Sequence, residues 1–190
     1  MKMRESGMPA EAYWESLFDV PAIGQHFGFE HVCGDVAELG CGYGTFTVPI
    51  AMRIGGVIHA YGIDSSMIDL TRRRAAGAGC TNVRPVLRDV FEGGFDVLTA
   101  SCEAVVLFNI LHGEQPLTLL HEARRILRPG GFVAVIHWRT DLDTPRGPNA
   151  SIRPPPEQIQ ALARATGAFS EVASPVFLPP WHYGIELVAV

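Results

Sequence analysis

The chain has 190 residues, of which 47% are hydrophobic and 18% are charged. This length and balance predict a single globular domain over residues 1–190 and exclude disordered and collagen-like classes. The net charge of −5 argues against a nucleic-acid substrate, because proteins that bind nucleic acid usually carry a basic excess or stripe. The one dense basic run, residues 72–74, is expected to be a solvated helix face.

Neither a membrane segment nor a metal site is predicted. The longest uncharged stretches, 39–52 and 172–185, are shorter than the ~18–20 apolar residues that a membrane span needs. The first ten residues lack the apolar core of a signal peptide, and the four cysteines form no CxxC pair and have no zinc spacing. We therefore expect a cytoplasmic protein with reduced thiols. The sequence leaves open whether the chain forms a homo-oligomer.

Strand-like and helix-like segments alternate along the chain with short connections. One or two short helices are expected within residues 9–29, so that residues 1–30 form an N-terminal helical lid. Strands are expected at 32–39, 57–63, 83–87, 104–110, 132–138, 172–178 and 185–190. Helices are expected at 45–54, 67–76, 116–127 and 157–166.

Three further stretches complete the prediction. Residues 128–131 are expected to end the helix before the next strand begins, and residues 139–156 are expected to form a proline-rich loop. Residues 91–102 are hard to assign, because they could form either a strand or part of a loop. The alternation predicts an α/β fold with an open, mostly parallel sheet covered on both faces, in which a closing hairpin adds an antiparallel strand.

A glycine cluster, ELGCGYG, lies between the first strand and the first helix of this sheet. Glycine allows a sharp turn and a close approach of a ligand, and loops at the carboxyl ends of strands are where open α/β sheets bind ligands. Asp64 ends the next strand, where a carboxylate can accept two hydrogen bonds from a ribose. The alternative is a tight turn without a ligand, followed by an aspartate that only caps a helix.

A nicotinamide dinucleotide site has the same layout but a different glycine spacing. Its fingerprint is GxGxxG, whereas here Gly40, Gly42 and Gly44 give GxGxG. The acidic Glu38 before the loop would repel a pyrophosphate and suit a cationic ligand. Both departures favour a ligand with an amino-acid part and a sulfonium.

The sequence resembles the class I S-adenosylmethionine-dependent methyltransferases. VAELGCGYGTFTVPIA resembles the family's first motif, YGIDSSM the second and LRDV the segment near the adenine. VVLFNILH and LHEARRILRPGGFVAVI resemble the fourth-strand and fifth-strand motifs, so that the match covers residues 32–138. The resemblance implies a Rossmann-like, doubly wound, seven-stranded sheet with an antiparallel last strand and a short N-terminal helical extension. One departure is that Glu103 and Ala104 stand where the family usually has an aspartate, which leaves the alignment of 91–103 open.

The resemblance also implies where S-adenosylmethionine would bind and S-adenosylhomocysteine be released. The methionine end would lie on the glycine loop, the ribose on Asp64 and the adenine between Met67 and Val90, with its amino group near Asp89. The residues expected to bind the donor are Glu38, Gly40, Cys41, Gly42, Tyr43, Gly44, Asp64, Ser65, Met67, Arg88, Asp89, Val90 and Asn109.

The acceptor side is predicted from residues at the strand ends. His112 is our candidate base, needed only if the acceptor carries a proton, and its alternative role is a helix cap. Tyr13 and His137 could line the acceptor pocket. Arg146 and Arg153 could hold an anionic acceptor bidentately, the alternative being that they only fix the loop.

The function expected from the sequence is methyl transfer from S-adenosylmethionine to a small-molecule acceptor by in-line displacement. The short chain favours a small acceptor, because it lacks a second domain that would bind a polymer. Two rival interpretations are a regulatory or partner-binding protein that binds the donor without catalysis, and an NAD-dependent oxidoreductase. The glycine spacing disfavours the oxidoreductase.

Overall fold

The computed structural model describes residues 8–190, so the start of the expected lid, residues 1–7, lies outside it. Two short 3-10 turns occur at Phe29–His31 and Ala150–Ile152. The α-helices are α1 (Glu11–Glu15), α2 (Val20–His26), α3 (Thr47–Ala51), α4 (Ser65–Gly77), α5 (Val90–Gly93), α6 (Pro116–Ile126) and α7 (Pro156–Thr166). The strands are β1 (Asp35–Leu39), β2 (Ile58–Gly62), β3 (Val83–Leu87), β4 (Cys102–Phe108), β5 (Leu127–Trp138), β6 (Phe169–Val172), β7 (Val176–Leu178) and β8 (His182–Ala189).

Within residues 8–190 the strands form one eight-stranded sheet in the order β3-β2-β1-β4-β5-β8-β6, with β7 pairing to β8. Strands β1 to β5 are parallel, and β8 is antiparallel to β5, β6 and β7. The expected doubly wound sheet with an antiparallel last strand is therefore confirmed. The strand order reverses between the neighbours β1 and β4, and ligands of such sheets bind at this switch point.

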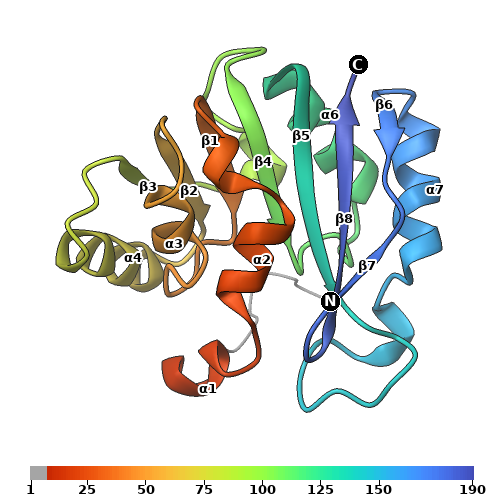
Figure 1. Cartoon of the computed structure of the whole chain (residues 1–190), viewed down its shortest axis with the longest axis horizontal. Coiled ribbons are helices and arrows are strands. Elements are labelled where there is room, and N and C mark those ends of the chain that lie inside the picture. The colour runs from red at the N-terminus through yellow and green to blue at the C-terminus, as the bar shows by residue number, and fades with distance from the viewer. Residues whose placement is uncertain (1–7) are drawn as a thin grey trace.

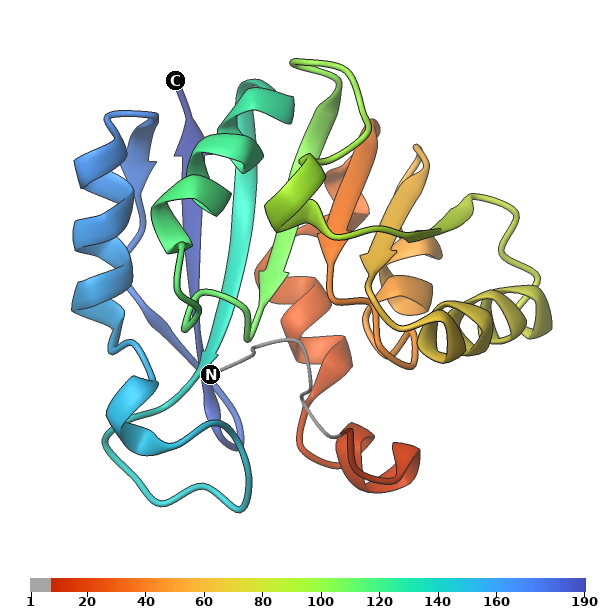
Figure 2. The same ribbon diagram turned by 180° about the vertical axis from the view of Figure 1, so that it is seen from behind.

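Helices cover both faces of the sheet. Helices α2 and α3 lie on the face toward the viewer in Figure 1, and α6 and α7 lie on the opposite face, seen in Figure 2. The β-strand side chains alternate between the two faces, so that Val105 and Val135 pack in one core and Val106 and Ile136 in the other. The carboxyl ends of β1 and β4, helix α1 and the 139–156 loop all lie at the lower end of both views.

The sheet has one strand more than expected because the segment predicted as a single strand, 172–178, is interrupted. Residues 173–175 belong to neither β6 nor β7: Ala173 N still donates to Glu186 O of β8 at 2.9 Å, but Pro175 has no N–H to donate. The expected hairpin is present: β7 and β8 pair with Leu178 opposite His182.

The predicted break at residues 128–131 is a wide bulge inside β5. Leu127 pairs with Cys102 and Phe132 with Ala104, so four residues of β5 face the single residue Glu103. Glu103 accepts hydrogen bonds from the backbone of Cys33 and Gly34 (3.1 and 2.6 Å) and pairs with Arg128 at 2.6 Å.

Glu103 lies inside β4, because the strand begins at Cys102, two positions earlier than predicted. Its carboxylate joins the chain before β1 to the bulge of β5. The unassigned stretch 91–102 contains the end of α5 and an irregular connection, and only its last residue enters β4. No helix among residues 8–190 is both long and apolar enough to cross a membrane.

Candidate active site

The glycine-rich loop connects β1 to α3 at the switch point of the sheet. Gly40, Gly42 and Gly44 have φ angles of +87°, +52° and +77°, in the left-handed region that other residues adopt only with strain. A Cβ atom on Gly40 would also lie 3.1 Å from Cδ1 of Ile110, which follows β4. The loop therefore needs glycine both for its conformation and for its contact with the chain after β4.

Glu38 lies under this loop rather than on its surface. Its side chain is buried, and Oε2 accepts a hydrogen bond from the Thr47 hydroxyl at 2.5 Å. Burial raises the pKa of Glu38 to about 7, although the bond from Thr47 lowers it. Burial, followed by the charge of Glu38, also raises the pKa of the Cys41 thiol to about 12, so this thiol is not a nucleophile at neutral pH.

The two aspartates predicted to bind the donor both begin helices. Asp64 accepts bonds at Oδ1 from the backbone and the hydroxyl of Ser66 (2.8 and 2.6 Å), and these bonds lower its pKa. Asp89 caps α5 by accepting from Phe91 N at 3.0 Å. Asp64 and the neighbouring Ser65 are exposed at the end of β2, so their capping role does not close them off from a ligand.

The remaining residues predicted near the adenine are placed differently. The guanidinium of Arg88 donates from Nε to Gly94 O at 2.6 Å and from Nη2 to Gly93 O at 2.5 Å, which fixes the end of α5. Val90 is buried in the core, whereas Met67 is half-buried at the start of α4.

Two buried polar side chains near the switch point lack partners among the described residues. They are the Thr45 hydroxyl, directly after the glycine loop, and both amide atoms of Asn109, directly after β4. Asn109 also has a positive φ of +58°, which is uncommon for a residue other than glycine. Buried polar groups without partners are costly, so both side chains suit a ligand that supplies the missing hydrogen bonds.

His112 and His137 form a contact at the carboxyl ends of β4 and β5. Nδ1 of His112 lies 3.3 Å from Nε2 of His137, and the ring planes are nearly perpendicular at 83°. His112 is half-buried, whereas His137 is fully buried and therefore lies beneath His112 rather than on an open pocket wall. Burial lowers the pKa of both imidazoles, to about 3 for His137.

A third buried imidazole is that of His182, in the hairpin turn after β7. It stacks on Phe18 with centroids 4.5 Å apart and lies 4.2 Å from the Trp138 ring. Neither of its nitrogens has a partner among the described residues, and burial lowers its pKa to about 3. From its position in the turn PPWHYG, the sequence allows His182 either to line the acceptor pocket or to be only a satisfied polar residue.

The arginines of the 139–156 loop are placed as follows. Arg153 donates from Nε, Nη1 and Nη2 to the backbone carbonyls of Pro148, Arg139 and Arg146 at 2.8–3.3 Å. Its guanidinium also lies 5.9 Å from the Trp138 ring centroid. These contacts favour the alternative in which Arg153 fixes the loop. Arg146 is half-buried, and its carbonyl accepts from both Thr144 and Arg153.

A half-open cavity of about 270 Å³ lies between this loop, α7 and β7. Tyr183 lines it, and the same ring stacks against His137 with centroids 6.3 Å apart. Arg139, paired with Asp141, and the exposed ring of Phe177 form part of the wall, with the guanidinium 4.4 Å from the ring centroid. The cavity is thus separated from the histidine pair by one tyrosine ring.

The N-terminal segment crosses this end of the sheet. Tyr43 in the glycine loop donates to Pro9 O at 2.8 Å, and a Cβ on Gly42 would lie 3.4 Å from Cε of Met8. Phe18 forms an isolated β-bridge with Pro180 in the hairpin turn.

Helix α1 is also held by an ion pair to α4. Arg74 pairs with Glu11 at 3.2 Å and with Glu15. Tyr13, predicted to face the acceptor, is 44% exposed.

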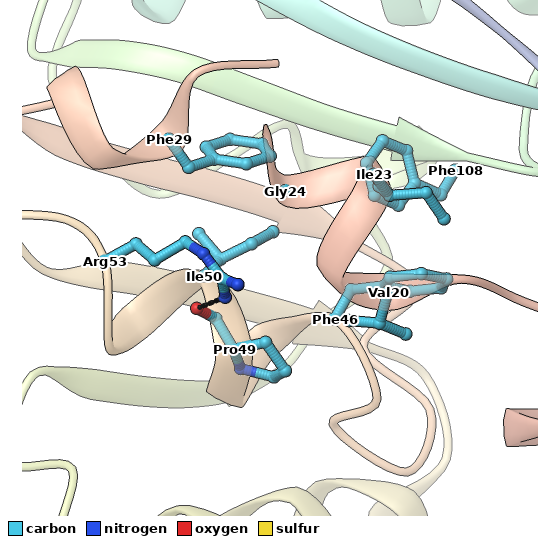
Figure 3. Close-up of a pocket in the computed structure, with 9 residues that line it drawn as sticks. All are labelled: Val20, Ile23, Gly24, Phe29, Phe46, Pro49, Ile50, Arg53 and Phe108. Carbon is cyan, nitrogen blue, oxygen red and sulfur yellow. Dashed lines mark hydrogen bonds between the residues drawn. The ribbon is translucent and has the colours of Figure 1, made fainter. Parts of the chain in front are cut away.

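A second pocket, between α2 and α3, is too small to be a ligand site. Figure 3 shows it lined by Phe29, Phe46 and Phe108, with Arg53 bonded to Pro49 O at 2.9 Å. Its volume of about 10 Å³ holds at most one water molecule. Among the described residues there is also no group of three side chains able to hold a metal ion.

Comparison with known proteins identifies the family. The model of the family described as "Methyltransferase domain" matches residues 36–131, just over half of the chain. This chain belongs to the methyltransferase domain family. The resemblance to class I S-adenosylmethionine-dependent methyltransferases is thereby confirmed, and the chain is a methyltransferase with S-adenosylmethionine as its cofactor.

Solved structures share the fold of this methyltransferase. A SAM-dependent methyltransferase from Aquifex aeolicus aligns with a TM-score of 0.81 and 18% identity over 95% of this chain and 94% of its own. A geranyl diphosphate methyltransferase in complex with SAM aligns with a TM-score of 0.70 and 15% identity, over 97% of this chain and 93% of its own. The apo form of the S-adenosylmethionine-dependent methyltransferase SibL aligns with a TM-score of 0.72 and 22% identity. The alignment covers 94% of this chain but only 56% of the longer SibL chain. No curated protein matches by sequence.

Proposed function

We propose that this methyltransferase transfers the methyl group of S-adenosylmethionine to a small-molecule acceptor at the carboxyl ends of β1, β4 and β5. The observation that carries the proposal is the glycine-rich loop at the switch point, with three left-handed glycines. Beside it lie the polar groups of Thr45 and Asn109, which find no partner within residues 8–190. An amino-acid carboxylate and ammonium are groups that a hydroxyl and an amide can bind together. Asp64, at the end of the adjacent strand, would bind the ribose.

In the reaction, the protein would hold the donor and the acceptor in line and would accept a proton where the acceptor carries one. When bound, S-adenosylmethionine would supply an electrophilic methyl group, and attack by the acceptor's lone pair would break the methyl–sulfur bond and leave S-adenosylhomocysteine. The protein would mainly hold the two molecules in line, which can lower a barrier by roughly 7–11 kcal/mol in favourable cases. His112, the half-buried member of the imidazole pair, would take the proton of a protonated acceptor.

Two features support a small acceptor. The cavity of about 270 Å³ beside Tyr183 is of a size for a small organic molecule and lies on the other side of the Tyr183 ring from His137. The N-terminal segment crosses the same end of the sheet, from the glycine loop at Tyr43 to the hairpin at Pro180. Such a cover leaves less room for a polymer than for a metabolite.

Calorimetric titration tests the proposal in two steps. S-adenosylmethionine and S-adenosylhomocysteine should bind with one site per chain, whereas NAD should not bind. A mass-spectrometric screen of small molecules against the loaded protein should then find a product heavier by one methylene unit. Donor binding with no methylated product from any small acceptor, but methylation of a protein or nucleic acid, would contradict the small-acceptor assignment.

A further inference from the structure

A charged pair on helix α6 binds the backbone just after helix α5. Oε1 of Glu122 accepts a hydrogen bond from the N–H of Phe95, and Nη2 of Arg125 donates to the carbonyl of Phe95, both at 2.8 Å. The two side chains are also bonded to each other, from Nε to Oε2 at 2.8 Å and from Nη2 to Oε1 at 2.7 Å. Arg125 also donates from Nη1 to Val97 O at 3.2 Å. The pair thus fixes both polar backbone groups of Phe95, two residues after α5 ends.

The end of α5 is also held by Arg88, which follows β3. The Arg88 guanidinium donates to the carbonyls of Gly93 and Gly94 at 2.5 and 2.6 Å. A Cβ on Gly93 would lie 2.9 Å from Nη2 of Arg88, and a Cβ on Gly94 would lie 2.6 Å from Oε1 of Glu122. These two glycines therefore allow both side chains to approach the backbone, and a larger residue at either position would displace one of them.

A third contact comes from strand β2. The hydroxyl of Tyr61 donates to Oδ1 of Asp96 at 2.6 Å, and the Tyr61 ring lies 5.0 Å from the buried ring of Phe95 at an angle of 71°. Helix α5 has only four residues, and so short a helix is not stable by itself. Its position is therefore set by its contacts with β2, with the end of β3 and with α6.

The chain around α5 lies where the base of the donor would be. Under the proposed function, the amino-acid part of the donor lies on the glycine-rich loop after β1, and the ribose lies on Asp64 after β2. The sheet order is β3-β2-β1, and Arg88 N donates to Gly62 O at 2.8 Å, so the chain after β3 lies beside the chain after β2. A donor that extends from β1 to β2 therefore brings its base next to the start of α5, at Asp89.

From these contacts we infer that Glu122 and Arg125 are positioning residues for the nucleobase of the donor. They act through α5, because their hydrogen bonds fix the segment that follows it and so hold Asp89 at the place of the base. The path of the donor in this inference rests on the proposed function, whereas the hydrogen bonds do not depend on it. The alternative is that the pair only stabilises the fold, like the similar pair of Glu103 with Arg128.

Two matched variants separate these roles. Glu122→Ala and Glu103→Ala each remove a carboxylate that accepts from the backbone and pairs with an arginine, but Glu103 lies at the amino end of β4, away from the donor. Calorimetric titration with S-adenosylhomocysteine measures the dissociation constant of each variant. We expect it to rise about tenfold or more in Glu122→Ala, because a small displacement of a binding group is costly, and to stay within about threefold in Glu103→Ala. Equal dissociation constants in the two variants would overturn the inference.

The preference for the base is the quantity that a purely structural role would not change. S-inosylhomocysteine carries hypoxanthine, which has a carbonyl oxygen where adenine has its amino group. A carboxylate only accepts hydrogen bonds, so Asp89 can bind the adenine amino group but repels that oxygen. The wild type and Glu103→Ala should therefore prefer S-adenosylhomocysteine about tenfold or more, as expected for one charged hydrogen bond. This preference should fall in Glu122→Ala, and an unchanged preference there, or none in the wild type, would contradict the inference.

A milder variant covers the case in which Glu122→Ala does not fold. Glu122→Gln keeps an oxygen for the N–H of Phe95 but loses the charge that binds Arg125, so the preference for adenine should fall in the same direction. Circular dichroism and melting temperature show whether each variant is folded before it is titrated. In that case, wild-type affinity and preference in Glu122→Gln would reject the inference.

The same titrations distinguish this inference from the proposed function. A wild type that binds neither compound rejects the proposed function and, with it, the inference. A wild type that binds S-adenosylhomocysteine, together with a folded Glu122 variant that behaves like it, rejects the role of the α6 pair alone.

Discussion

The hydroxyl of Tyr43, in the glycine-rich loop, donates a hydrogen bond to the backbone carbonyl of Pro9 at a distance of 2.8 Å. This bond places the N-terminal segment directly over the loop that we assign to the donor. Helix α1 is held at the same end by the ion pairs of Arg74 with Glu11 and Glu15. A donor that enters from this side therefore has to displace the segment.

Release of this segment should speed the exchange of the donor. Arg74→Ala should raise both the association and the dissociation rate of S-adenosylmethionine about two- to fivefold, because partly exposed ion pairs contribute only ~0.2–1 kcal/mol. Stopped-flow fluorescence measures both rates. Arg72→Ala is the matched control, since Arg72 pairs with Asp69 on its own helix. Equal rates in the two variants would show that the segment is not a lid.

The carboxylate of Asp64 should be needed for donor affinity but not for folding. Asp64→Asn keeps a good helix-capping side chain and removes only the charge. We expect the dissociation constant for S-adenosylmethionine to rise at least tenfold, because charge-assisted hydrogen bonds to the ribose are lost. Melting temperature should change little. Wild-type affinity in this variant would remove Asp64 from the donor site.

Gly42 should be required for binding as well as for conformation. Gly42→Val puts a branched side chain at a φ of +52° and into the space over the loop. The control is Gly79→Val, which has a φ of +73° and open space around its Cβ. Both variants should lose ~1–2 kcal/mol of stability, but only Gly42→Val should abolish donor binding in calorimetry. Equal binding would mean that the loop is only a turn.

Acid should destabilise the protein through its buried histidines. The pKa values of His137 and His182, about 3 when folded, lie below the ordinary 6.5, so the unfolded chain binds more protons between these values. The free energy of unfolding therefore falls as the pH is lowered from 6.5 toward 5. Glu38 has the opposite effect: its pKa is raised to about 7 in the folded chain, so between pH 7 and 4.5 the folded chain binds one proton more at this residue than the unfolded chain does. His182→Phe should make the melting temperature less dependent on pH, and an unchanged slope would contradict the assignment.

Arg153 should matter more for stability than for the donor. Arg153→Ala removes three hydrogen bonds to carbonyls of the 139–156 loop and should cost about 1–3 kcal/mol, a fall of several degrees in melting temperature. Donor affinity should stay within about threefold. The exposed Arg84 on β3 provides a control variant, Arg84→Ala. An unchanged melting temperature would contradict this structural role and favour the alternative in which Arg153 binds an anionic acceptor.

Much of the fold follows from local patterns. Strand β3 and helices α6 and α7 begin and end within one residue of their predicted positions, since apolar periodicity and flanking prolines and glycines act over a few residues. The same patterns failed at 172–178, where the prediction joined β6 and β7 into one strand across Ser174 and Pro175. They also failed at Glu103, whose partners lie before β1 and in the bulge of β5.

The sequence by itself determined the α/β alternation, the glycine-rich loop and the family, because these depend on residue order and spacing. Only the tertiary structure decided that Glu38 is buried against Thr47 and that Arg153 bonds to its own loop. It also decided that His112 and His137, 25 residues apart, meet at 3.3 Å. Such contacts depend on the register of β4 against β5 and on which face each side chain takes, and a shift of one residue would separate them.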